Sequence, residues 1–197
     1  METILFLLSS FAYLLGSIPF GFIVGKARGI DIRAVGSKST TSTNVSRVLG
    51  WRWGLVSAFF DVIKGVIPVL VAQNYLEPGY GLALVAILPM MGHIFPIYLG
   101  FRGGKGAATF FGASAVLIGL KLFLSWFVIW IAALLIFRKT SLTNLIFVWI
   151  FVALLFFNFP IYYFAYGLAG AIVMTFALRE NIKRLRQGTE PKTAFKW

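Results

Sequence analysis

Long apolar runs separated by short polar segments dominate the chain. The first run, residues 3–25, has 23 uncharged residues, enough to span about 30 Å of hydrocarbon at about 1.5 Å per residue. Two further apolar runs cover residues 53–72 and 79–99. His93 and Pro96 interrupt the last of these runs, which predicts a helix that ends early or a loop that re-enters the membrane against protein.

Two longer apolar stretches each predict a pair of helices. The 32 residues between Lys105 and Arg138 would measure about 48 Å as one helix, which is too long for one crossing and short for two. We therefore place a turn at Gly119 and Lys121 and expect two shortened helices. The stretch from 142 to 178 divides at Pro160 in the same way. A single tilted helix in place of the shortened pair leaves five or six spans as the alternative.

The sequence thus predicts an all-α membrane protein with seven transmembrane helices, some short or re-entrant, in one domain over residues 1–197. On this arrangement 16 of the 18 Lys and Arg residues lie on the side that holds the C-terminus. Cytoplasmic loops carry the excess of basic residues in membrane proteins. We therefore expect the N-terminus outside and the C-terminus in the cytoplasm.

Composition supports this class and narrows the chemistry. With 59% hydrophobic residues, 12% charged residues and a mean hydropathy of +0.88, the chain is not a water-soluble globule. The absence of Cys and the single His exclude disulfides, thiolate sites and multi-histidine metal centres, so we expect neither metal nor cofactor. The net charge of +12 points to lipid headgroups, phosphorylated substrates or topology, and no nucleic-acid partner is expected.

The first polar loop is rich in hydroxyl groups. Residues 36–47 hold seven Ser and Thr side chains, one amide and two cations. Small hydroxyl side chains and exposed N–H groups suit a phosphate cradle, and Arg47 can bind phosphate bidentately. A flexible Ser/Thr-rich loop without a ligand is the alternative.

The second polar loop reads Gly-Gly-Lys-Gly at residues 103–106, with Thr109 one turn into the following helix. Glycines allow close backbone approach, and a helix N-terminus with a nearby lysine favours an anion. The loop is not a Walker A motif, because Leu99 stands where that motif needs glycine. The alternative is a basic turn that anchors the helix at the headgroups.

Charged and titratable residues inside the apolar runs are few. Asp61 and Lys64 are three residues apart on one helical face, which favours a mutually neutralising structural pair. His93 could act as a base, although a histidine at a helix break more often hydrogen-bonds within its loop.

Taken together, these motifs resemble the membrane-bound glycerol-3-phosphate acyltransferases that use acyl phosphate as donor, the bacterial PlsY family. The family is described as seven-helical with its N-terminus outside. The resemblance extends over nearly the whole chain and rests on residues 16–21, 61–65, 92–109, 141–142 and 180–185, with Gly188 and Glu190.

The resemblance implies transfer of a fatty acyl group from acyl phosphate to the 1-hydroxyl of glycerol 3-phosphate. It also implies a bacterial cytoplasmic (inner) membrane protein whose active site faces the cytoplasm. The partners are then the two substrates and membrane lipid, and no protein partner is predicted. Catalytic roles are expected for Lys105, Ser141 and Arg47. Substrate binding is expected for Ser37, Lys38, Thr43, Asn44, His93, Gly103, Gly104, Gly106, Thr109 and Asn181.

The chain departs from the family pattern in two places. Lys38, Ser39, Thr41 and Ser42 occupy positions where the family has Gly, Asn, Gly and Ala, and 177–178 is Ala-Leu where the family has Arg-His. We therefore expect either a rearranged acceptor site or a divergent paralogue with another donor or acceptor.

A small anion or lipid transporter and a structural membrane subunit are the remaining alternatives. A transporter would place polar residues on both membrane faces. A structural subunit leaves the Gly-Gly-Lys-Gly helix start unexplained.

Overall fold

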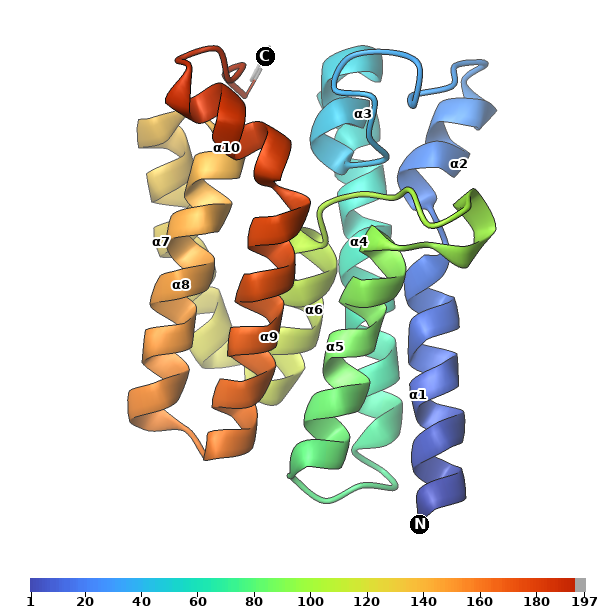
Figure 1. The fold of residues 1–197 in the computed structure, drawn as a ribbon, viewed down its shortest axis with the longest axis vertical. Coiled ribbons are helices and arrows are strands. Elements are labelled where there is room, and N and C mark those ends of the chain that lie inside the picture. The colour runs from blue at the N-terminus through green and yellow to red at the C-terminus, as the bar shows by residue number, and fades with distance from the viewer. Residues whose placement is uncertain (194–197) are drawn as a thin grey trace.

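The computed structural model describes residues 1–193, and within that range every regular element is helical. The helices stand side by side as a bundle (Figure 1). In chain order they are α1 (Glu2–Ser17), α2 (Phe20–Ala27), α3 (Ser42–Leu49), α4 (Trp51–Ala72), α5 (Tyr80–Ile94), the 3-10 helix η1 (Ile97–Leu99), α6 (Ala107–Leu117), α7 (Leu120–Phe137), α8 (Thr140–Asn158), α9 (Ile161–Ala177) and α10 (Arg179–Arg186).

Most of the long helices have the length and composition of membrane spans. Five segments of the described chain meet both criteria: Glu2–Ala27, Trp51–Ala72, Tyr80–Leu99, Leu120–Phe137 and Thr140–Asn158. Helices α9 and α10 make a sixth candidate if they are one span, bent by 62°. Helix α6 is apolar but has only 11 residues. Length and composition therefore give five or six spans, with α6 as an additional short apolar helix.

The interruptions in the apolar runs fall where turn-forming residues stand. The predicted turn between the shortened helices is confirmed at Gly119, where α6 and α7 part, whereas Lys121 lies in the first turn of α7. The predicted division at Asn158, Phe159 and Pro160 is confirmed, because α8 ends at Asn158 and α9 begins at Ile161. The first apolar run is one candidate span, Glu2–Ala27, with a break between α1 and α2 at Pro19. Proline lacks the N–H that a helix interior needs, and its ring clashes with the preceding turn. Helix α5 ends at Ile94, as the early-ending alternative predicted.

Small residues let α4 and α6 approach closely. A Cβ atom built on Gly65 would lie 2.1 Å from the backbone oxygen of Thr109, and one on Gly112 would lie 2.2 Å from that of Val62. Each helix therefore offers a glycine to the backbone of the other. Within a bilayer such small-residue contacts are a main source of helix association, because lipid is as apolar as the side chains.

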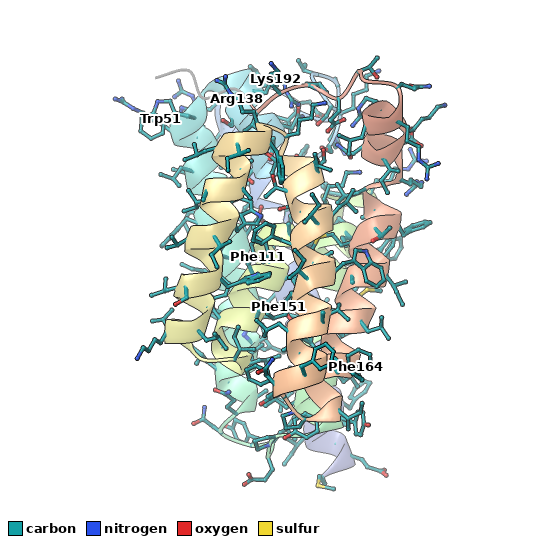
Figure 2. All side chains as sticks on the ribbon, turned by 90° about the vertical axis from the view of Figure 1, so that its left-hand side faces the viewer. Trp51, Phe111, Arg138, Phe151, Phe164 and Lys192 are labelled. Carbon is teal, nitrogen blue, oxygen red and sulfur yellow. The ribbon has the colours of Figure 1, made fainter. Side chains whose placement is uncertain are left out.

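The polar segments gather at one end of the bundle. The loop between α2 and α3, helix α3, helix α10 and the C-terminus lie at the end opposite the N-terminus (Figure 1). Trp51, Arg138 and Lys192 mark this end in Figure 2. Phe111 and Phe151 lie midway along the bundle and are buried. This polar end is where the predicted site residues belong.

Candidate functional site

Three segments supply the polar side chains on this side of the bundle. The loop of residues 28–41 with α3 and the tail from α10 to residue 193 lie at the end itself, whereas the loop of residues 95–106, which joins α5 to α6, lies deeper in the bundle (Figure 1). The beginning of α8 contributes one further serine to the tail.

Asn44 shapes the first loop from inside. Its side chain is fully buried, and its Oδ1 accepts a hydrogen bond from the backbone N–H of Ser37 at 2.8 Å. Its Nδ2 donates to the carbonyl oxygens of Ile32, Val35 and Ser39 at 3.0 to 3.1 Å. The amide is thus engaged within the loop, which makes Asn44 a residue that positions its neighbours.

The remaining predicted residues of this loop face outward to different degrees. Ser37 and Lys38 are exposed, whereas Thr43 and Arg47 on α3 are half-buried. Lys38 has a φ of 54°, in the left-handed region, which costs a residue with a side chain about 1–2 kcal/mol. This is the position where the resembling family has glycine. The loop therefore keeps a glycine-like backbone while presenting a cation.

Close packing explains the glycines of the second loop. The N–H groups of Gly103 and Gly104 donate to the backbone oxygens of Ile94 and His93 at 3.1 and 3.0 Å. A Cβ atom on Gly104 would lie 2.0 Å from Nε2 of His93, so no side chain fits there. These two N–H groups are therefore engaged within the protein, and the roles of Gly103 and Gly104 as substrate contacts stay predictions. The N–H groups of residues 105–109, up to the third residue of α6, have no acceptor among residues 1–193, whereas that of Phe110 donates to the backbone oxygen of Gly106.

Lys105 lies between the second loop and the tail. Its Nζ donates to the backbone oxygen of Ala177, at the last turn of α9. Burial, followed by the positive charges of Arg179 and Arg184, lowers the pKa of Lys105 below its ordinary value. An ammonium has three N–H donors, so the bond to Ala177 leaves two for a phosphate.

Thr109 lies away from the loop surface. Its side chain is fully buried, and its backbone meets α4 at Gly65. Its Oγ1 has no hydrogen-bond partner among residues 1–193. Thr109 is therefore part of the α4–α6 contact, and its role as a substrate contact stays a prediction.

A buried polar triad, formed by Asp61, Lys64 and His93, contacts the second loop. Lys64 Nζ lies 2.9 Å from Asp61 Oδ1 and donates to the backbone oxygen of Ile18, at the break between α1 and α2, at 2.8 Å. Nδ1 of His93 lies 3.3 Å from the same Asp61 oxygen. The predicted neutralising pair is confirmed. His93 joins this pair on one side and packs against Gly104 on the other.

Glu190, a carboxylate for which the sequence predicted no role in the site, binds three side chains of this region. Glu190 Oε1 accepts hydrogen bonds from Ser141 Oγ and Asn181 Nδ2, both at 2.7 Å. Its Oε2 accepts from Arg184 Nε, also at 2.7 Å. Glu190 is only 9% exposed. Burial favours its neutral form, but the hydrogen bonds from Asn181, Ser141 and Arg184 outweigh burial and lower the pKa of Glu190.

The structure brings some of the predicted residues together. Ser141 and Asn181 meet on Glu190, and Lys105 is close enough to interact with the charges of Arg184 and Glu190. Within the described chain, no hydrogen bond or ion pair joins the first loop to this group. Residues 1–193 also hold no group of three or more His, Asp or Glu side chains arranged to bind a metal ion.

Comparison with known proteins finds one family across almost the whole chain. The model of the glycerol-3-phosphate acyltransferase family matches residues 6–188. A protein of that name from Thermus thermophilus is 42% identical over 180 residues, which cover 91% of this chain and 90% of that protein. Another from Rubrobacter xylanophilus is 38% identical over 196 residues and covers 98% and 95%.

Solved structures agree with these relatives. A crystal structure of PlsY (YgiH), described as an integral membrane glycerol 3-phosphate acyltransferase in its glycerol 3-phosphate form, matches with a TM-score of 0.91 at 33% identity over 96% of each chain. The lysophosphatidic acid form matches with a TM-score of 0.88 at 33% identity, over 95% of this chain and 94% of that one. The fold described above is therefore that of a multi-pass integral membrane protein.

Proposed function

Because the chain belongs to the glycerol-3-phosphate acyltransferase family and is thus an acyltransferase, we propose that its donor is a fatty acyl phosphate. Its acceptor is the 1-hydroxyl of glycerol 3-phosphate, and its products are lysophosphatidic acid and phosphate. The observation that carries the proposal is the position of Lys105. This partly buried ammonium lies directly before α6, donates to the backbone oxygen of Ala177 and is near the positive charges of Arg179 and Arg184.

The reaction places modest demands on the protein. An acyl phosphate is a mixed anhydride and already activated, so the site has to hold two phosphates and align the hydroxyl with the carbonyl carbon. Lys105 and Arg47 supply positive charge, and the uncapped N–H groups at the start of α6 favour an anion. The hydroxyl oxygen bonds to the carbonyl carbon, and the carbon–oxygen bond to phosphate breaks. The departing phosphate takes the proton of the hydroxyl.

We further propose seven membrane segments in a single domain over residues 1–197, with the N-terminus outside and the active site facing the cytoplasm of a bacterial inner membrane. Counting α6 and α9 with the five long segments gives this number. The chain then alternates in direction from α1 to α9, and the N-terminus and the C-terminus lie at opposite ends, as in Figure 1. The side with the C-terminus carries 16 of the 18 Lys and Arg residues.

An assay with purified protein in lipid tests the proposal. Palmitoyl phosphate is supplied with and without glycerol 3-phosphate, and phosphate and lysophosphatidic acid are measured. We expect phosphate release that depends on the acceptor and yields lysophosphatidic acid. Lys105→Ala should lower the rate about 100-fold, because it removes a charge-assisted contact to phosphate in a partly buried site.

Lys121→Ala is the matched control, since Lys121 is exposed at the start of α7 and away from the site. Its rate should equal that of the unaltered protein. Donor hydrolysis without acceptor dependence would identify a divergent paralogue with another acceptor. Absence of donor turnover would contradict the proposed acyl transfer from acyl phosphate. Transport of an anion or a lipid would then be the function to test.

A further inference from the structure

We propose that Glu190 fixes Ser141 and Asn181 as hydrogen-bond acceptors and so selects an acceptor substrate that carries two free hydroxyl groups. The inference rests on the proposed function and deepens it. It assigns Glu190 as a positioning and specificity-determining residue, whereas Ser141 and Asn181 touch the substrate.

The hydroxyl of Ser141 has a single proton. A carboxylate oxygen without a proton can only accept, so the 2.7 Å contact between Ser141 Oγ and Glu190 Oε1 uses that proton. The hydrogen bonds of the cluster lower the pKa of Glu190, which keeps the carboxylate ionised at neutral pH. The lone pairs of Ser141 Oγ are what remains for a substrate. Ser141 can then accept a hydrogen bond from a substrate hydroxyl and cannot donate one.

Asn181 is oriented in the same way. Its Nδ2 donates to Glu190 Oε1 at 2.7 Å, and this contact fixes which end of the amide is nitrogen, because a carboxylate has no proton to give. Its Oδ1 is buried and has no hydrogen-bond partner among residues 1–193. A buried acceptor left unpaired destabilises the protein. Such an atom calls for a donor that arrives with the substrate.

The two acceptors lie next to each other because they share one carboxylate oxygen. Glu190 itself is held in place by Arg184, which donates to the other oxygen. Further along the tail, Thr193 donates its N–H to the backbone oxygen of Arg138 and bonds through Oγ1 to Thr140. The tail is therefore fastened to the beginning of α8 on which Ser141 stands. The carboxylate cannot drift away without breaking these bonds.

Two adjacent acceptors match the two adjacent hydroxyls of a glycerol phosphate. Each substrate hydroxyl brings one proton to donate, and each protein oxygen accepts one. One of these hydroxyls is the reacting group, and a hydrogen bond to its proton orients the oxygen lone pair toward the acyl carbon. An acceptor that lacks the second hydroxyl leaves a buried oxygen unpaired, and sites of this kind discriminate strongly against such analogues.

The test compares two acceptors in the assay described above. The first is glycerol 3-phosphate, and the second is 3-hydroxypropyl phosphate, which lacks the middle hydroxyl. We expect the unaltered protein to prefer glycerol 3-phosphate at least tenfold in kcat/KM. Glu190→Ala should lower this preference to near one, mainly through slower reaction of glycerol 3-phosphate. The reason is that both side chains are then free to rotate.

Arg186→Gln is the control variant. Arg186 is a cation on the same helix α10, and within the described chain it makes no hydrogen bond or ion pair with Glu190, Ser141 or Asn181, so the preference for glycerol 3-phosphate should persist. Equal loss of both activities in Glu190→Ala, with the preference unchanged, would assign Glu190 a merely structural role and overturn the inference. So would an unaltered protein that uses both acceptors equally. Inactivity of the unaltered protein toward both acceptors would instead contradict the proposed function.

Discussion

Lys105 shows how the environment of one side chain sets the chemistry of this site. Its ammonium is partly buried, bonded to Ala177 and close to the cations Arg179 and Arg184. All three features act on the same group: burial and the neighbouring charges disfavour the charged form, and the carbonyl oxygen anchors it. The lysine is thus held in position with a lowered pKa, as is common for groups that work in active sites.

This arrangement predicts an early alkaline limit of activity. A lysine that binds phosphate has to be charged, so kcat/KM should fall as the pH rises through the lowered pKa of Lys105, below the ordinary value of 10.5. Lys105→Arg keeps the charge throughout this range and should move the alkaline limb to higher pH. Rates are measured from pH 6 to 10.5 after subtraction of spontaneous donor hydrolysis. An identical alkaline limb in both proteins would rule out Lys105 as the titrating group.

At the scale of elements, the α4–α6 contact fixes the position of the second loop relative to the buried triad. Gly65 and Gly112 allow the two backbones to touch. Helix α4 carries Asp61 and Lys64 of the triad, and α6 begins directly after the loop. The depth of α6 in the bundle therefore depends on residues without side chains. Any atom added at this contact has to push one helix away from the other.

Gly112→Ala tests this contact. The new methyl group would lie 2.2 Å from the backbone oxygen of Val62, which cannot move aside as a side chain can. We expect a loss of about 1–3 kcal/mol in stability and a lower thermal midpoint in detergent. Gly81→Ala on α5 is the control, since its methyl group meets only two leucine methyl groups, at 3.6 and 3.9 Å. Equal midpoints for both variants would contradict the proposed packing role.

The sequence predicted the apolar helices and their turns more fully than the tertiary contacts. The lengths of the hydrophobic runs indicated the apolar helices, and Gly119 and Pro160 indicated two breaks. Both signals are local, because a turn-forming residue ends a helix through its own backbone and its immediate neighbours. Run length alone does not locate the break at Pro19, because the apolar run continues on both sides of it. Glu190 was missed as a site residue because its partner Ser141 lies 49 positions away, and no local spacing encodes that contact.

At the scale of the whole molecule, the protein is polar at one end and apolar along its sides. The long helices expose much of their apolar surface. Of the 18 residues of α7, only Leu134 is buried within the described chain. The basic residues collect at the end that holds the tail. This asymmetry suits a protein whose helix sides contact lipid and whose polar end contacts charged molecules.

The proposed orientation can be measured with single cysteines, since the chain has none of its own. Gln73→Cys lies in the exposed turn between α4 and α5, and Gln187→Cys lies in the exposed tail. A membrane-impermeant maleimide added to intact bacterial cells should label Gln73→Cys, and should label Gln187→Cys only after the membrane is opened. The reverse pattern would place the N-terminus in the cytoplasm.

The short length of α6 affects how a donor with a long hydrocarbon chain and a water-soluble acceptor reach the same site. Helices α6 and α7 share one end at Gly119, but their lengths are about 16 and 27 Å, so the loop before α6 stops about 10 Å short of the far end of α7. Pulling a palmitoyl chain into water would cost about 0.8 kcal/mol per methylene, more than about 10 kcal/mol in total. On the proposed membrane arrangement the loop would lie below the level of the lipid headgroups. The chain of a proposed acyl phosphate would then stay dissolved among lipid tails, and only the small polar acceptor would have to travel.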